Sequence, residues 1–159
     1  MGLFKYHNTD PIIRSDIAQW VRRGAIDIDG FLDSNCTDIG YVMELSPSYR
    51  VFVDVTAFDP AKGGYLDKTT EYAIEDDGST IFRPGTPYLV MPKYFIRSEK
   101  FRPIYLPTRQ LARFGVHIQD ATDDDWNYER KLLCMTVTRP TIIRNDHPML
   151  LVNFIPRNT

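Results

Sequence analysis

Eleven prolines divide this chain of 159 residues into short segments, and their spacing is the feature that most restricts its fold. Proline lacks a backbone donor and breaks the interior of a helix, so it is confined mainly to turns and strand ends. Between the prolines lie brief runs rich in β-branched and aromatic residues, which are typical of strands. These runs span 41–45, 49–55, 80–82, 88–91, 104–106, 116–118, 132–138, 141–144 and 149–155. The sequence therefore predicts a mainly β fold of sandwich or jelly-roll type.

One short helix is predicted near the start of the chain. Ser15 is the expected N-cap, Ile17 and Trp20 begin an apolar stripe, and Gly24 follows the last turn. Later, the residues 76–78 predict a hairpin turn, because Asp and Gly favour tight turns. In the strand at 49–55, Phe52 alternates with a row of valines, so burial on both faces is expected.

Composition sets the class of protein. Hydrophobic residues make up 43% and charged residues 25%, which predicts one globular domain over residues 1–159. The net charge of −2 gives no general attraction to nucleic acid. No apolar run is long enough to cross a bilayer and none resembles a signal peptide, so neither a membrane nor secretion is expected. The expected location is the cytoplasm, or the host cytoplasm if the protein is viral.

Several kinds of catalytic site are excluded by missing motifs. Neither a phosphate-binding P-loop nor the glycine pattern of a dinucleotide fold occurs. Cys36 and Cys134 lie far apart without metal-ligand spacing, so no disulfide framework and no zinc site are predicted. The zinc deaminase signature is also missing. The three histidines are isolated, and each is interpreted as structural or solvated.

An acidic segment stands out between two apolar strands. It contains Asp120 and residues 123–125, followed by Trp126 and Tyr128. Aspartate is common in turns, so a solvated turn is one interpretation. Carboxylates also suit Mg²⁺ or a reacting water, which is the other interpretation. The two aromatic rings fit either stacking on a base or ordinary packing.

Short motifs follow one another in a characteristic order along the chain. They are IRSDI at 13–17, CTDIG at 36–40, FRPGTPYLV at 82–90, LARFGV at 111–116, an Ala at 121, an Asp-to-Trp spacing at 123–126, and HPM at 147–149. In this order they resemble the deoxycytidine triphosphate (dCTP) deaminase and dUTPase superfamily, with the deaminase branch closer. The resemblance implies a dUTPase-like distorted jelly roll with one N-terminal helix. It also implies a homotrimer with sites at subunit junctions and a deoxynucleotide ligand, with Mg²⁺ accompanying a triphosphate.

The departures from the family fall on its chemistry. The family's phosphate motif has an arginine and two serines where this chain has Thr108, Arg109 and Gln110. The deaminase branch places a glutamate in a strand as general acid and base, because attack of water on the base needs proton transfer in both directions. Two alignments of that strand place Leu133 or Met135 there. Neither residue can transfer a proton.

The resemblance assigns site residues one by one. Nucleotide binding falls to Arg109, Gln110, Arg113, Ala121, Asp38 and Trp126. Asp123, by its acidic and aromatic context, and Glu129, as the nearest acid, are the candidates for a catalytic base. Arg113 has a second interpretation as the partner of a carboxylate such as Asp38, because guanidinium groups match carboxylates as well as phosphates.

Three hypotheses follow. The first is a homotrimer that lacks the standard catalytic residues and binds a nucleotide or serves a structural role. The second is a divergent but active, zinc-independent dCTP deaminase or dUTP pyrophosphatase. The third is a protein-interaction or viral assembly module, suggested by Tyr65, Tyr94 and Phe101, which look exposed in the sequence.

Overall fold

The structure is a computed structural model, and it describes residues 12–53, 57–62, 68–120 and 131–157. The N-terminal helix α1 spans Ile17–Arg22 and is followed by a 3₁₀ turn at Asp33–Asn35. The predicted helix is thus confirmed, but its N-cap is Asp16, not Ser15, and the Asp16 side chain makes no capping hydrogen bond.

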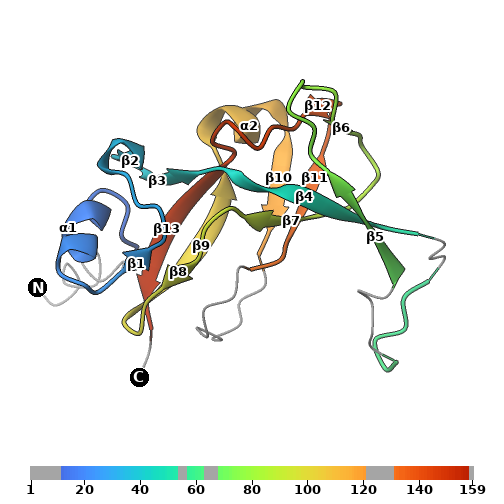
Figure 1. Cartoon of the computed structure of the whole chain (residues 1–159). Coiled ribbons are helices and arrows are strands. Elements are labelled where there is room, and N and C mark those ends of the chain that lie inside the picture. The colour runs from blue at the N-terminus through green and yellow to red at the C-terminus, as the bar shows by residue number, and fades with distance from the viewer. Residues whose placement is uncertain (1–11, 54–56, 63–67, 121–130, 158–159) are drawn as a thin grey trace, which may run out of the picture.

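Most strands belong to two antiparallel sheets (Figure 1). The five-stranded sheet has the order β10 (Val116–Gln119), β11 (Leu133–Val137), β7 (Tyr88–Pro92), β4 (Leu45–Phe52) and β5 (Thr69–Ala73). The four-stranded sheet has the order β2 (Cys36–Thr37), β3 (Gly40–Met43), β13 (Leu150–Pro156) and β9 (Phe101–Pro107). In Figure 1, α1 lies at one end of the molecule and β5 at the other.

Two short ribbons complete the strands. One joins β1 (Asp27–Ile28) to β8 (Ile96–Arg97), and the other joins β6 (Ile81–Phe82) to β12 (Thr141–Ile142). The turn predicted at 76–78 is present, with Gly78 at a φ of 79°. It does not close a hairpin, because β5 pairs with β4 whereas β6 pairs with β12.

The core is one cluster that draws side chains from both larger sheets. Met43, Leu150 and Val152 come from the four-stranded sheet, and Val90 and Leu133 come from the five-stranded sheet. The central strand β13 is buried on both faces, since all residues from Leu150 to Phe154 are at most 8% exposed. The burial expected on both faces of the strand at 49–55 is found only in part, because Tyr49 to Phe52 are half-buried, β4 ends at Phe52, and Val53 is exposed.

Two of the three aromatic residues that look exposed in the sequence are buried or half-buried in the structure. Phe101 is only 2% exposed and packs its ring edge-on against Trp20, with centroids 4.9 Å apart. Tyr94 is half-buried, and Tyr65 lies outside the described residues. The interaction-module hypothesis therefore loses two of the three residues that suggested it. Within the described ranges, no helix is long and apolar enough to cross a membrane.

Candidate functional site

A cavity of about 390 Å³ opens where three segments distant in sequence meet. Its lining consists of Thr37, Asp38, Ile39 and Val42, then Thr108, Arg109 and Gln110, and finally His147, Pro148 and Leu151. The segments meet because β13 pairs with β3 on one side and with β9 on the other. Leu151 lies opposite Val42 and Leu106 in these two ladders, so the start of β13 forms the centre of the cavity wall.

The turn between β2 and β3 holds Asp38 at the cavity. The Thr37 hydroxyl donates to the carbonyl of Gly40 at 2.7 Å and accepts from the backbone N–H of Ile39 at 3.2 Å. Gly40 has a φ of 148°, and its backbone passes close to Val152 in β13. The two hydrogen bonds and this close approach fix the backbone of the turn, and the exposed Asp38 lies at its tip.

Arg109 and Gln110 reach the cavity from the start of α2 (Arg109–Phe114), a helix that the sequence analysis missed. The N–H of Thr108 donates to Met149 at 3.3 Å, and the N–H of Met149 donates to Met43 at 3.1 Å. These bonds join all three lining segments through the backbone. The side chains of Arg109 and Gln110 are exposed, so both can reorient towards a ligand.

The lining combines charged groups with an apolar wall. Arg109 supplies a cation, Asp38 a carboxylate, and His147 an exposed imidazole, while Ile39 and Leu151 supply apolar surface. A guanidinium and an amide can bind phosphate oxygens, and the apolar wall can hold a flat ring. Among the described residues, no three His, Cys, Asp or Glu side chains gather closely enough to hold a metal ion.

Neither thiol offers a nucleophile. Burial, with a smaller effect of the Asp33 carboxylate, raises the pKa of Cys36, and burial raises the pKa of Cys134. Because the thiolate is the reactive form, these shifts lower the reactivity of both side chains at neutral pH.

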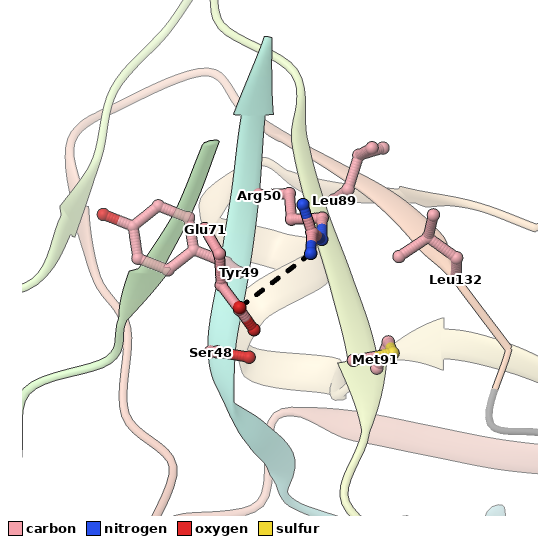
Figure 2. A pocket seen from close by; sticks show the side chains of 7 residues that line it. All are labelled: Ser48, Tyr49, Arg50, Glu71, Leu89, Met91 and Leu132. Atoms are coloured by element: carbon pink, nitrogen blue, oxygen red, sulfur yellow. Dashed lines mark ion pairs between the residues drawn. The ribbon is translucent and has the colours of Figure 1, made fainter. Parts of the chain in front are cut away.

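A second hollow, of about 190 Å³, lies on the outer side of the five-stranded sheet (Figure 2). Leu89, Met91 and Leu132 line one side of it. Figure 2 shows Arg50 between these side chains and Glu71, with which it forms an ion pair at 3.8 Å. Arg50 also donates to the Thr69 hydroxyl at 3.1 Å. This hollow is smaller and more apolar than the first cavity, and its one cation is already paired.

The structure brings together three of the predicted site residues, namely Asp38, Arg109 and Gln110. Arg113 is exposed further along α2 and does not line the cavity. It forms no ion pair with Asp38 among the described residues. The remaining predicted site residues, Ala121, Asp123, Trp126 and Glu129, lie outside the described residues.

His147 is a lining residue that the sequence analysis did not select. It was interpreted as a structural or solvated histidine, and it is indeed exposed. Its neighbour Met149 is hydrogen-bonded to β3, which brings the 147–148 segment to the cavity. The match of 147–149 to a family motif was the available signal, but it carried no information about the direction of the side chain.

Comparison with known proteins shows the fold. No family model matches the sequence, and no curated protein matches it. The structure is similar to the crystal structure of 2′-deoxycytidine 5′-triphosphate deaminase from Agrobacterium tumefaciens, with a TM-score of 0.62 and 13% sequence identity over 92% of this chain. The chain has the dUTPase-like β fold. It spans about half the length of the deaminase chain, since the match covers 48% of that chain.

Two apolar residues of interest lie in strand β11 of this fold. Leu133 and Met135 are the alternatives for the position of the family's glutamate, and both are 0% exposed in the core. They share one face of β11 because side chains in a strand alternate. Both side chains belong to the core, and neither lines the cavity at Asp38 and Arg109.

Proposed function

We propose that this chain is a dCTP deaminase/dUTPase-like protein that lacks the standard catalytic residues and binds a deoxynucleotide in the cavity at Asp38, Arg109 and Gln110. The observation that carries the proposal is the meeting of these three residues in one cavity on a dUTPase-like fold. They come from two segments, the β2–β3 turn and the start of α2, and the family resemblance had assigned each to nucleotide binding.

Each lining group has a role in this proposal. The Arg109 guanidinium pairs with phosphate oxygens, and the Gln110 amide donates to them in place of a lost serine. Ile39 and Leu151 provide an apolar surface for the base or sugar. Asp38 accepts a hydrogen bond from a ligand N–H or O–H group. Arg109 is the main source of affinity, because charge-assisted hydrogen bonds are the strongest of these contacts.

The proposal includes Mg²⁺ bound together with the phosphates of the nucleotide. Asp38 is the one carboxylate among the residues that line the cavity in the described part of the chain. This suits Mg²⁺, which is usually bound by one or two carboxylates together with the phosphates of a nucleotide. When bound, the ion would neutralise charge on the triphosphate, and Asp38 is the residue placed to hold it.

The proposal also includes a homotrimer in which the open cavity lies at a subunit junction. A neighbouring subunit would then close the cavity and contribute further ligand contacts. Sedimentation equilibrium tests this part directly, because a monomer at micromolar concentration would contradict it while leaving nucleotide binding by a single chain open.

Replacing Arg109 with glutamine is expected to weaken deoxynucleotide binding about 10- to 100-fold, which corresponds to a lost hydrogen bond to a charged group. A ligand that binds only the native state raises the unfolding temperature, so thermal shifts with dCTP, dUTP and dTTP, with and without Mg²⁺, measure the change. The matched control is Arg83→Gln, an exposed arginine that does not line the cavity.

The Arg109 experiment has clear contrary outcomes. If Arg109→Gln and Arg83→Gln lower the thermal shift equally, the cavity is not the binding site. Arg113→Gln in the same series tests whether Arg113, which does not line the cavity, contacts the ligand, since such a contact would change the thermal shift. No shift with any nucleotide would remove the binding function and favour structural reuse of the fold.

The alternative of an active enzyme rests on Asp123 or Glu129 as the base. In that case Asp123→Asn should abolish formation of dUTP from dCTP, or of dUMP from dUTP, because an amide cannot accept the proton from water. Product analysis by chromatography measures this. We expect no product from the unmodified protein, and turnover that survives in Asp123→Asn would leave Glu129 as the candidate base.

A further inference from the structure

We propose that a groove around Trp20, separate from the nucleotide cavity, binds an acidic peptide segment of a partner protein through one apolar side chain and its flanking carboxylates. This groove, called the Trp20 groove here, has a volume of about 500 Å³ and is lined by Ile13, Trp20, Glu99, Lys100, Phe101, Pro156 and Arg157. It lies at the end of β13, whereas the nucleotide cavity lies at the beginning of that strand. The inference does not depend on the proposed function.

The backbone around the groove is fixed before any ligand binds. The buried Ser98 hydroxyl donates to the carbonyl of Ala25 at 2.6 Å and accepts from the N–H groups of Lys100 and Phe101 at 3.2 and 2.9 Å. The Arg157 Nε–H donates to the carbonyls of Ser98 and Phe101, each at 3.2 Å. Because the groove is preformed, its own residues lose little conformational entropy when a ligand binds.

The floor of the groove is apolar. The rings of Trp20 and Phe101 meet edge to face at an angle of 67°, and Phe101 is almost fully buried beneath. Ile13 is held beside them by two backbone hydrogen bonds with Phe154, of 2.7 and 3.1 Å. Pro156 closes the other side. A surface of this kind accommodates a leucine or phenylalanine side chain, as in the central pocket of many interfaces.

The rim of the groove is mainly cationic. The ammonium of Lys100 lies 5.0 Å from the Trp20 ring centroid. Arg157 adds a second positive charge to the lining, and its backbone contacts hold it in place. The Arg23 guanidinium does not line the groove, but it lies 5.3 Å from the same Trp20 centroid. Glu99 is the one acidic residue among those that line the groove. The local charge is thus opposite in sign to the chain's net charge of −2.

This combination of floor and rim fits an acidic peptide better than a nucleic acid. Nucleic-acid sites line up several cations along an extended surface and gain most of their affinity from phosphates. Here the positive charges surround a compact apolar floor instead. A peptide with carboxylates on either side of an apolar residue would pair with the cations of the rim and place the apolar side chain on the floor. The opposite charges would also speed association.

The test is the binding of a fluorescein-labelled peptide of eight residues, made of aspartate and glutamate with one central leucine, measured by fluorescence anisotropy. We expect binding that weakens with added salt, because the charges at the rim are exposed. Lys100→Glu should weaken it about tenfold or more, and Glu99→Gln should tighten it about twofold, since exposed charge pairs contribute modestly. Both residues are exposed, so neither change threatens folding.

The matched control is Lys93→Glu. The ammonium of Lys93 lies 5.5 Å from the Tyr94 ring centroid, so it forms the same kind of lysine–aromatic pair outside the groove. Its replacement makes the same change in net charge, and peptide affinity should stay within about twofold of the unmodified protein. An equal loss in Lys93→Glu and Lys100→Glu would reduce the effect to net charge and overturn the proposal.

Four other results would also overturn it. The first is that the peptide fails to bind. The second is that a peptide with glycine in place of leucine binds equally well, which would mean that the apolar side chain contributes nothing. A single-stranded oligonucleotide of eight thymidines binds more tightly than the peptide and with the same dependence on Lys100, which assigns the groove to nucleic acid. Lys100→Glu lowers the oligomeric mass in sedimentation equilibrium, which makes a second copy of this chain the occupant.

Discussion

Asp120→Asn is expected to lower the free energy of unfolding by about 3 kcal/mol, because it leaves the positive charge of Lys131 in a largely buried position without this counter-charge. Lys131 Nζ lies 2.7 Å from Asp120 Oδ1, and the two side chains are 18% and 11% exposed. The contact is an ion pair without a directed hydrogen bond at Oδ1. Urea unfolding followed by circular dichroism measures the loss as a lower transition midpoint at unchanged m-value.

Asp120 also joins the edges of the two main sheets. It follows β10, the edge of the five-stranded sheet, and its Oδ2 accepts from the backbone N–H of Tyr105 in β9, the edge of the four-stranded sheet, at 3.2 Å. Burial, and secondly the Asp120 carboxylate, raises the pKa of Tyr105, so the phenol stays neutral. Asparagine can still accept from Tyr105, whereas alanine cannot, so Asp120→Ala should be more destabilising than Asp120→Asn.

A double-mutant cycle with Lys131→Met separates the ion pair from the packing of each side chain. The single changes should each cost about 3 kcal/mol, whereas the double variant should cost roughly 1 kcal/mol, because replacing both members removes the buried charge as well as its partner. Additive losses would mean that the two side chains contribute independently, and the buried ion pair would then have no role in stability.

Asp120 illustrates how far the sequence alone can predict this fold. Counted with residues 123–125, it belongs to an acidic turn with two equally plausible interpretations. The structure buries it against Lys131, a residue eleven positions later, whereas residues 123–125 lie outside the described residues. Composition shows how many carboxylates a segment has, but which of them is buried depends on the pairing of β9 with its neighbours, which no local pattern encodes.

The elements that were predicted correctly are those with strong local patterns. The apolar runs in β7, β11 and β13 and the stripe of α1 each carry a periodicity of their own. The polar strand β5 was missed because it is a sheet edge with mostly exposed side chains. The helix α2 was missed because none of its six residues is buried, so it lacks the apolar stripe that α1 of the same length carries, although Gly115 ends it in a left-handed conformation at a φ of 102° and offered a signal.

The sequence predicted residues of the candidate site, but it did not predict that they lie close together in space. Asp38 and Arg109 lie 71 positions apart, and only the family resemblance connected them before the sheet order was known. The Trp20 groove had no sequence signal of any kind, because Trp20 and Lys100 come from separate elements joined through the backbone around Ser98. Contacts of this type depend on tertiary pairing, and a motif does not contain them.

Gly40→Ala is expected to cost about 3 kcal/mol in stability and to abolish the thermal shift given by a deoxynucleotide, because it combines backbone strain with a steric clash at the cavity wall. A Cβ at Gly40 would lie 2.6 Å from the Asn153 Oδ1, 2.8 Å from the Val152 carbonyl oxygen and 2.9 Å from a Leu151 methyl group. A carbonyl of the central strand cannot move aside as a flexible side chain can.

The control variant Gly85→Ala introduces backbone strain without a steric clash. Gly85 also has a positive φ, of 88°, but a Cβ there would meet no atom within 4 Å, so this variant should lose only about 1 kcal/mol. The comparison by urea unfolding therefore measures the close approach of the β2–β3 turn to β13. If the two variants lost equal stability, the turn that holds Asp38 would be free to move away from β13, and the nucleotide cavity would not be the preformed site that the proposed function requires.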